Sequence, residues 1–272
     1  MGWPESGRLM QILVTNDDGV DAPALIPLAR ALAALGDVIV AAPDRERSWV
    51  GKAITRFEPV GVRELERAGM PVFAVTGYPA DAVQLGIHAF ARPAPDLVVS
   101  GINLGYNHGA GFLMSSGTVG AAVEAWISGV PAVAVSTGTM TDWHTWRELA
   151  VSPESEETWD RLAGLTRQLV VEVLDAGLGS HADVVSINMP FSSTPETPRR
   201  LTTIARVGYD RLFSYQGEGI YVHEYGGGMT QIDAVDGSDV DAAHDGVISI
   251  TPIRMPAAAV VPDDVRQAIE KR

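Results

Sequence analysis

The chain has 272 residues, 46% of them hydrophobic, so it is long enough to bury a large core. Its formal charge of -14, from 34 acidic and 20 basic residues, argues against nucleic acid or an anionic membrane as a partner and favours a small substrate. The absence of cysteine excludes disulfides and thiol chemistry. Because residues 1–9 lack the apolar centre of a signal peptide, and no apolar run approaches the roughly 20 residues that span a bilayer, we expect a cytoplasmic protein.

Short apolar runs recur along residues 10–190, after an N-terminal extension of residues 1–9. They are almost wholly apolar instead of alternating, which is typical of parallel strands buried on both faces. Right-handed crossovers would place the helical segments between them on both faces of one sheet. We therefore predict a doubly wound, mostly parallel, Rossmann-like α/β domain. The expected strands are 11–15, 37–43, 72–76, 96–101, 132–136 and 184–188, and the expected helices are about 24–35, 80–91, 117–128 and 155–177.

Pro27 limits where the first of these helices can begin. Proline is tolerated in the opening turn, before an amide donor is needed, so the helix should start close to Ala22 or Pro23.

Three further regions complete the predicted architecture. Residues 137–160 are polar and acidic but contain Trp143, Trp146 and Trp159, which indicates a lid or a subunit contact instead of a free linker. Residues 191–254 read as strands joined by glycine and aspartate turns, and we expect them to leave the sheet as an extended β arm. Residues 255–272 should contain a C-terminal helix, because proline and acidic residues precede its basic end.

Polar clusters follow three of the predicted strands. They are TNDDG at 15–19, PDRERS at 43–48 and SGINLGYN at 100–107. In open parallel sheets, ligands bind outside the carboxyl ends of the strands, where successive crossovers run in opposite directions. If the strands are neighbours, four side chains from a stretch of more than 80 positions can converge. They are Asp17, Asp18, Ser48 and Asn103.

These four side chains form an all-oxygen set, which suits a hard divalent ion such as Mg²⁺ or Mn²⁺. Such an ion would cancel the repulsion between the adjacent carboxylates of Asp17 and Asp18. The alternative is that Asn-Asp-Asp-Gly serves only as a turn and helix cap. The additional clusters at Ser48 and Asn103 favour the metal site, with one divalent ion per subunit.

The predicted helix at 117–128 opens with small and hydroxyl residues, namely Ser115, Ser116, Gly117 and Thr118. A helix start exposes free amide donors and partial positive charge, and neighbouring hydroxyls add donors, so this is a natural phosphate site. The alternative is that Ser116 merely caps the helix. Beside a metal site, phosphate binding is the favoured interpretation. The six histidines show no paired metal spacing, and His108 alone lies in a suspected site loop, where it could contact substrate.

Taken together, these segments resemble the SurE family, the stationary-phase survival proteins that act as metal-dependent 5'- and 3'-nucleotidases. The resemblance is dense over residues 10–136 and returns near 187–190 and 241–254. Each motif alone is weak, but their co-occurrence is specific. The segments that carry it are ILVTNDDGVDAPAL at 12–25, APDRERS at 42–48, GYPADAVQLGI at 77–87, RPAPDLVVSGIN at 92–103, SSGTVGAAVEA at 115–125 and DGVISITPI at 245–253.

The resemblance implies hydrolysis of nucleoside monophosphates with Asp17, Asp18, Ser48 and Asn103 as metal ligands. Asp17 is then also the candidate to orient or deprotonate the attacking water, so Asp17 and Asp18 are our expected catalytic residues. It further implies that Asn107, Ser116 and Thr118 face the phosphate. Finally, the arm after residue 190 would be exchanged between the subunits of a homodimer, with assembly into tetramers left open.

The chain departs from the family pattern near the expected substrate. Trp49 stands where the family usually has glycine, and its ring could stack on a base or narrow the pocket. Glu46 replaces a common asparagine. The loop at 107–116 is one residue longer than the family's, with Gly111 where an aspartate is expected and Ser115 in place of tyrosine. The reaction type is therefore better defined than the substrate.

Two alternatives to a nucleotidase stay open at this point. The altered residues would also suit a specialised phosphatase acting on a sugar or secondary-metabolite phosphate. The chain could instead be a catalytically silent nucleotide-binding protein, although an intact ligand set argues against that.

Overall fold

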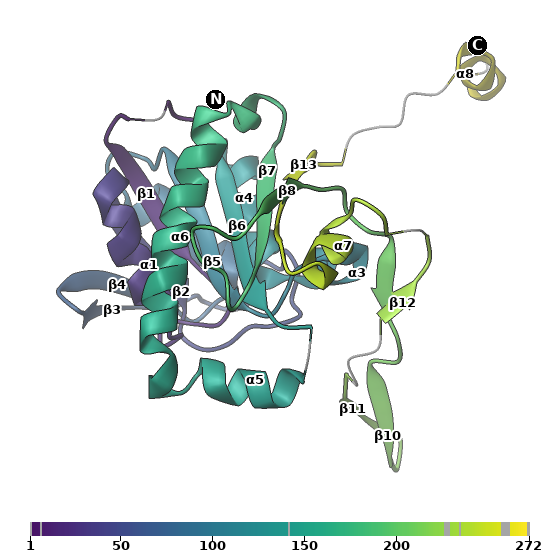
Figure 1. Ribbon diagram of the computed structural model, residues 1–272, viewed down its shortest axis with the longest axis horizontal. Coiled ribbons are helices and arrows are strands. Elements are labelled where there is room, and N and C mark those ends of the chain that lie inside the picture. Colours follow the sequence, from purple (N-terminus) through teal and green to yellow (C-terminus); the bar gives the residue numbers. More distant parts are fainter. Residues whose placement is uncertain are drawn as a thin grey trace.

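A nine-stranded sheet forms the centre of the molecule, with the strand order β3-β4-β2-β1-β5-β6-β7-β13-β8 (Figure 1). The computed structural model describes residues 2–5, 7–140, 142–225, 229–233, 235–256 and 262–270. The strands of this sheet are β1 (Met10–Thr15), β2 (Gly36–Pro43), β3 (Val62–Arg67), β4 (Met70–Val75), β5 (Leu97–Leu104), β6 (Ala132–Gly138), β7 (Val184–Pro190), β8 (Arg199–Leu201) and β13 (Ile248–Ile253).

Six of these strands are the parallel ones predicted from the sequence, and they stand side by side as β4-β2-β1-β5-β6-β7. From β1 the chain winds outward through β2 to β4, and it then returns to β5 on the other side of β1 and winds outward to β7. The winding direction therefore reverses between β1 and β5. Ligands of open α/β sheets bind outside the carboxyl ends of the strands at such a reversal.

Helices cover both faces of the sheet, as a doubly wound fold requires (Figure 1). On one face, α1 (Leu25–Leu32) and α6 (Glu156–Asp175) pack on the same apolar cluster as Ile12 and Val14 of β1. On the other, α2 (Pro79–Leu85) and α4 (Gly117–Ile127) pack with Leu13. Successive residues of a strand point to opposite faces, so the unbroken apolar run of β1 supplies both cores at roughly 1.5–3 kcal/mol for each large side chain.

The four predicted crossover helices are all present, with small shifts at their ends. Leu25 begins α1 two or three residues after the predicted start, and Pro27 then lies in the opening turn, where the backbone N–H is not needed. Short turns of 3₁₀-helix lie at Ala33–Leu35, Pro153–Ser155 and Leu178–Ser180, and a π-helical turn at Gly86–Phe90 extends α2.

Outside the segment predicted as an arm, three elements were absent from the sequence prediction. The charged strand β3 forms an antiparallel hairpin with β4 at one edge of the sheet. The helix α3 (Gly109–Ser115) occupies the loop before α4, and α5 (Trp143–Ala150) lies in the tryptophan-containing segment. Within that segment Trp146 and Trp159 are buried and both contact Phe191, so part of the predicted lid is packed core.

The expectation that residues 191–254 leave the sheet was wrong at both ends of that range. Strand β13 pairs antiparallel with β7, and β8 pairs parallel with β13, so both extend the main sheet. The strands between them lie outside it. They are β9 (Val207–Tyr209), β10 (Phe213–Gly217), β11 (Ile220–His223) and β12 (Met229–Gln231), with β9 paired to β12 and β10 to β11.

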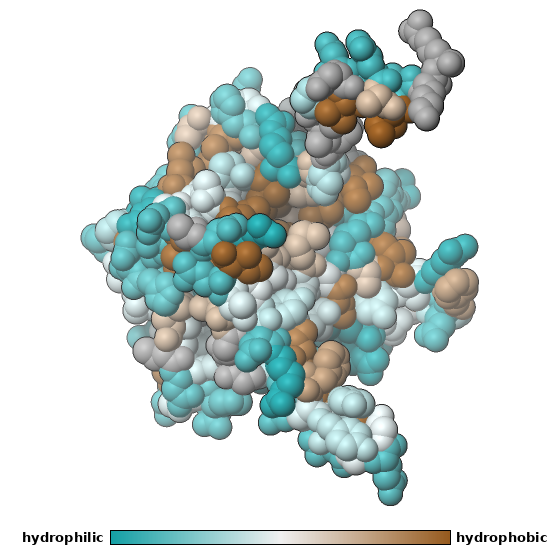
Figure 2. All heavy atoms as spheres, turned by 90° about the vertical axis from the view of Figure 1, so that its right-hand side faces the viewer, coloured by the Kyte–Doolittle hydropathy of each residue, from teal (hydrophilic) through white to brown (hydrophobic). Residues whose placement is uncertain are grey.

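The β10–β11 hairpin projects from the body, at the lower right of Figure 1 and the foot of the face seen in Figure 2. Its large side chains are exposed, among them Tyr215 at 61% and Tyr221 at 63%.

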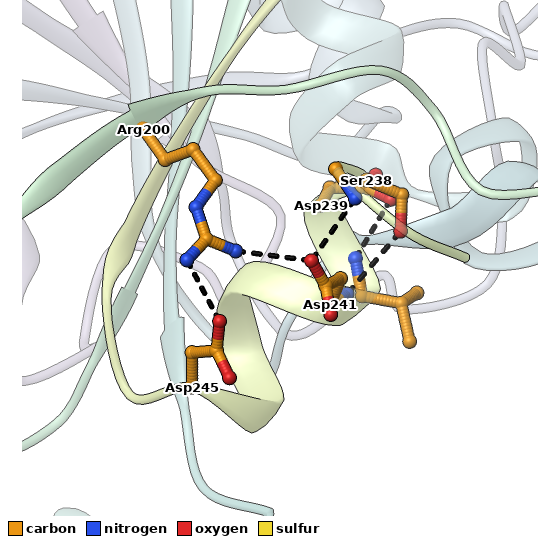
Figure 3. A network of polar contacts seen from close by, with 7 residues as sticks. Arg200, Ser238, Asp239, Asp241 and Asp245 are labelled. Carbon is orange, nitrogen blue, oxygen red and sulfur yellow. Dashed lines mark hydrogen bonds and ion pairs between the residues drawn. The ribbon is translucent and has the colours of Figure 1, made fainter.

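The helix α7 (Asp239–His244) returns the chain to the sheet after this excursion. Arg200 of β8 pairs with Asp241 at 3.0 Å and Asp245 at 2.7 Å, so two carboxylates fasten α7 beside the sheet (Figure 3). The predicted C-terminal helix is present as α8 (Asp263–Ile269), with Pro262 at its N-cap, and residues 257–261, 271 and 272 lie outside the described part. In the part of the chain that the structure describes, no helix has the length and apolarity to cross a membrane.

Candidate active site

The loop after β1 presents two carboxylates at the reversal point of the sheet. Asn16 fixes this loop, because its side chain accepts from the N–H of Gly19 and donates to its carbonyl, both at 3.0 Å. Gly19 has φ of 95°, and a Cβ there would lie 2.8 Å from the carbonyl carbon of Arg45. The turn therefore requires glycine and holds Asp17 and Asp18 against the chain that follows β2.

Asp17, in the loop after β1, is buried against the start of α4, with only 3% of its surface exposed. The hydroxyl of Thr118 donates to its Oδ1 at 2.5 Å. A Cβ on Gly117 would lie 2.7 Å from the Cβ of Asp17, so the helix can approach only because residue 117 has no side chain. The partial positive charge of a helix N-terminus favours a carboxylate at this point.

Asp18 joins the loop to β5. Its Oδ2 accepts from the backbone N–H of Leu104 at 3.0 Å, directly after Asn103. The pairing of β5 with β6 shifts register between Ser100 and Asn103, and such bulges re-aim side chains next to active sites. Asn103 donates through Nδ2 to the carbonyl of Gly105 at 2.7 Å, which leaves its Oδ1 as the atom suited to a cation.

The segment that contains Ser48 is tied to the loop after β1, since Arg47 donates its backbone N–H to the carbonyl of Asp17 at 2.7 Å. The Ser48 hydroxyl donates to Glu46 at 2.8 Å, and Glu46 also pairs with Arg147 of α5 at 2.8 Å. Sequence reasoning missed Arg147, because nothing in the polar 137–160 segment indicated that a helix would bring a guanidinium to this loop.

The environment raises the pKa of both carboxylates. Burial is the main cause for Asp17 and raises its pKa to about 6, opposed by the hydrogen bond from Thr118. For Asp18, burial and then the negative charge of Asp17 raise the pKa well above its ordinary value, opposed by the N–H of Leu104. A pair that resists double ionisation in this way gains free energy from a nearby cation.

The chemistry of the donors fits a hard cation. Across the described residues, no three or more His, Cys, Asp or Glu side chains gather as a metal site, so the candidate consists of two carboxylates completed by neutral oxygens. Hydrogen bonds tie Asp17 to segment 47–48 and Asp18 to segment 103–104. The neighbouring strands β2, β1 and β5 thus bring the three predicted clusters to one place.

The residues predicted to face phosphate differ in their surroundings. Ser116 caps α4 by accepting from the N–H of Val119 at 3.0 Å, which leaves its hydroxyl hydrogen available to a ligand. The Ser115 hydroxyl donates back into α3, to the carbonyl of Gly111 at 2.8 Å. Asn107 is buried and donates to Ser136 at 2.8 Å. Among these residues, Gly117 and Thr118 lie against Asp17.

His108 is 5% exposed, and among the described residues neither of its ring nitrogens has a hydrogen-bond partner. Burial lowers its pKa to about 4, so the ring is neutral at pH 7. It stacks on Tyr106, with ring centroids 5.0 Å apart and planes inclined by 27°. These contacts are those of a packed ring.

Asp239 at the start of α7 holds the loop that contains His108, another role that the sequence did not reveal. Its Oδ2 accepts from the N–H of Gly109 at 2.8 Å, and its Oδ1 accepts from the N–H of Ala205 at 2.9 Å. Figure 3 shows Asp239 at the opening turn of α7. A buried carboxylate therefore links the arm to the loop before α4.

Trp49 is the centre of an aromatic cluster that also links the site to the arm. Its φ is 62°, in the left-handed region that glycine prefers. Its ring lies near those of Phe112, Tyr209, His223 and Tyr225, with centroid distances of 5.8, 5.3, 5.1 and 5.7 Å. Three of these partners belong to the arm.

Comparison with known proteins gives a consistent result. The family model described as Survival protein SurE matches residues 12–212. The 5'-nucleotidase SurE of Methanocella arvoryzae is 36% identical over 255 residues, covering 92% of this chain and 93% of that protein. The 5'-nucleotidase SurE of Geobacter sulfurreducens is 40% identical over 249 residues, with coverage of 90% and 88%. The crystal structure of the SurE protein from Aquifex aeolicus superposes with a TM-score of 0.70 at 29% identity, covering 96% of this chain and 98% of that one.

Proposed function

The chain belongs to the SurE family, and from this premise we propose that it is a divalent-metal-dependent phosphomonoesterase that hydrolyses nucleoside 5'- or 3'-monophosphates. The single observation that carries the proposal is the meeting of Asp17 and Asp18 with three other segments. These segments are 47–48, 103–104 and the N-terminus of α4. The two carboxylates form a negatively charged site for a cation, and the N-terminus of α4 beside them supplies amide donors for an anion.

The proposed metal site consists of Asp17, Asp18, Ser48 and Asn103, and Mg²⁺ or Mn²⁺ matches its all-oxygen donors. The cation would neutralise charge on the phosphoryl group and lower the pKa of a water molecule. Ser48 would have to turn from Glu46 to take part, and Arg147 would then be the remaining partner that holds Glu46.

The residues of the chain have separate tasks in this proposal. Asp17 orients the attacking water and accepts its proton. Thr118 donates to Asp17 and keeps the carboxylate aimed. The free amides in the first turn of α4, together with Thr118, stabilise the negative charge that develops on the phosphoryl oxygens.

We further propose that the arm mediates a homodimer. Its β10–β11 hairpin exposes large apolar and aromatic side chains that would gain free energy from burial against a second subunit. The exposed set comprises Phe213, Tyr215, Ile220, Tyr221 and Val222. Exchange of the arm between subunits would provide that burial.

Phosphate release from a panel of nucleoside monophosphates and sugar phosphates, with Mn²⁺ or Mg²⁺ and with EDTA, tests the activity. We expect release with either metal, its loss with EDTA, and preference for nucleotides. A strong preference for sugar phosphates would indicate the specialised phosphatase, an alternative motivated by the aromatic cluster around Trp49, next to Ser48 in sequence. Release no faster than that of an Asp18→Ala variant would leave only a nucleotide-binding protein.

A further inference from the structure

A basic groove of about 520 Å³ lies beside the segment that leads from β2 to Ser48. Its charged lining residues are three arginines, Arg45, Arg47 and Arg56, and one carboxylate, Glu58. In a chain with a formal charge of -14, such a concentration of guanidinium groups is a departure from the general surface. Arginines gathered in a concave site are the usual means of binding phosphate.

Most N–H donors of the three groove guanidinium groups have no partner within the described part of the chain. Among the described residues, Arg45 and Arg56 form no ion pair or hydrogen bond. Arg47 donates from one terminal nitrogen to the carbonyl of Thr76 at 2.7 Å, and the same nitrogen lies 3.9 Å from a carboxylate oxygen of Asp44. The Nε of Arg47 is buried and has no acceptor in the described part of the chain. A buried charged donor without a partner is available to an acceptor from outside the protein, such as an oxyanion.

Two aromatic rings support these side chains. The guanidinium of Arg47 lies 5.6 Å from the centroid of the Tyr78 ring, and that of Arg56 lies 5.1 Å from that of Phe57. Stacking on a ring holds the planar group while leaving the N–H donors at its edge free. Arginines held in this way lose less conformational entropy when they bind an oxyanion.

The segment from Arg45 to Arg47 borders both the groove and the candidate active site. Arg47 directs its side chain into the groove, while its backbone N–H donates to the carbonyl of Asp17 at 2.7 Å. The backbone of Arg45 packs against Gly19, next to Asp18. One ligand could therefore place an anion at each of the two sites.

We propose that this groove binds a second oxyanion, a phosphate group of the substrate other than the one that is hydrolysed. The substrates it favours are nucleotides that carry two phosphate groups on one ribose. The choice of a nucleotide rests on the proposed function, whereas the oxyanion site rests on the groove itself. The same chemistry could also accept free phosphate, and the experiment separates these sources.

The test compares adenosine 3',5'-bisphosphate with adenosine 5'-monophosphate as substrates of the metal-loaded protein. We expect KM to be about tenfold lower or more for the bisphosphate, which corresponds to about 1.4 kcal/mol. In an Arg45→Ala/Arg56→Ala double variant the ratio of the two KM values should approach one. Arg30→Ala removes an exposed arginine of α1 far from the groove in the fold and should keep the ratio of the wild type.

Calorimetric titration of the full-length protein in EDTA, where no turnover occurs, provides a second reading. Bisphosphate that binds more tightly than monophosphate only when Arg45 and Arg56 are present supports the proposal even if no ester is hydrolysed. Inorganic phosphate that binds with the same dependence, without any gain for the bisphosphate, would overturn the substrate assignment and identify a free-anion site. If the double variant binds every one of these ligands with the affinity of the wild type, the groove is not an oxyanion site.

Discussion

At the scale of single residues, the proposed chemistry depends on the adjacent carboxylates of Asp17 and Asp18. The fold buries Asp17, half-buries Asp18 beside it, and supplies two hydrogen-bond donors, Thr118 and the N–H of Leu104. These donors offset only part of the free-energy cost of ionising the two carboxyls, because the pKa of both stays raised. A tolerated repulsion of this kind is common at functional sites, where a ligand completes the charge balance.

Replacing Asp17 by asparagine keeps the shape of the side chain and removes its charge and basicity. We expect a loss of phosphate release of about 100-fold or more, since both metal binding and proton transfer are affected. Circular dichroism and the melting temperature of the metal-free protein should stay at wild-type values or rise. Asp21→Asn, at an exposed carboxylate nearby, should leave the activity unchanged, and an active Asp17→Asn variant would exclude Asp17 from the mechanism.

Trp49 adopts a backbone conformation that costs a non-glycine residue roughly 1–2 kcal/mol, and its ring contacts offset that cost. Trp49→Ala removes the rings and keeps the strain, whereas Trp49→Gly removes both. We expect the glycine variant to be more stable than the alanine variant by about 1 kcal/mol in denaturant titration. Equal stabilities would show that the backbone at residue 49 is not strained.

At the scale of elements, the N-terminus of α4 and the ends of β1, β2 and β5 make the site. Sequence reasoning identified these four elements because their apolar runs and turn residues are local signals. It missed α5 and α7, whose contributions to the site are Arg147 and Asp239. Their roles depend on contacts between distant segments, which no local pattern encodes.

The same distinction explains the arm. Strands β8 and β13 have few residues or mixed polarity, and their places in the sheet are determined by pairing with β7 and with each other. Composition could show extended chain after residue 190 but could not show which strands would return. Likewise, local sequence could not show that the Ser115 hydroxyl donates into α3 or that Asn107 donates to Ser136, and their contact with phosphate stays a prediction.

Gly117→Ala tests the close approach of α4 to β1. The added methyl group would meet the Cβ of Asp17 at 2.7 Å and must displace either the carboxylate or the helix. We expect phosphate release to fall by about 100-fold, because misplacement of a reacting group by about 1 Å has costs of that order. Gly164→Ala in α6, where a Cβ meets nothing within 4 Å, should keep full activity and gain up to about 1 kcal/mol of stability.

At the scale of the whole molecule, the site makes stability depend on pH and on metal. The pKa of Asp17 rises from 3.8 in its ordinary state to about 6 in the folded protein, so the folded state binds more protons between these values. The contribution of Asp17 therefore falls as pH rises from about 4 to about 6, by on the order of 3 kcal/mol. His108, whose pKa is lowered to about 4, contributes in the opposite direction over pH 4 to 6.5.

Comparison of wild type with Asp17→Asn isolates the contribution of Asp17 to the pH dependence of stability. In EDTA, the free energy of unfolding of the variant relative to wild type should increase between pH 4 and pH 7. Saturating Mn²⁺ should stabilise the wild type at pH 7 and leave the variant nearly unchanged, because only the wild type offers the full charge. Parallel pH profiles for the two proteins in EDTA would contradict a raised pKa for Asp17.

In the proposed site, oxygens from three distant segments hold a divalent cation where the winding of the sheet reverses. Anomalous diffraction from a crystal grown with Mn²⁺ tests it most directly. We predict a single strong anomalous peak in each subunit, within coordination distance of Asp17, Asp18, Ser48 and Asn103. No peak at that position, or a peak bound by other residues, would contradict it.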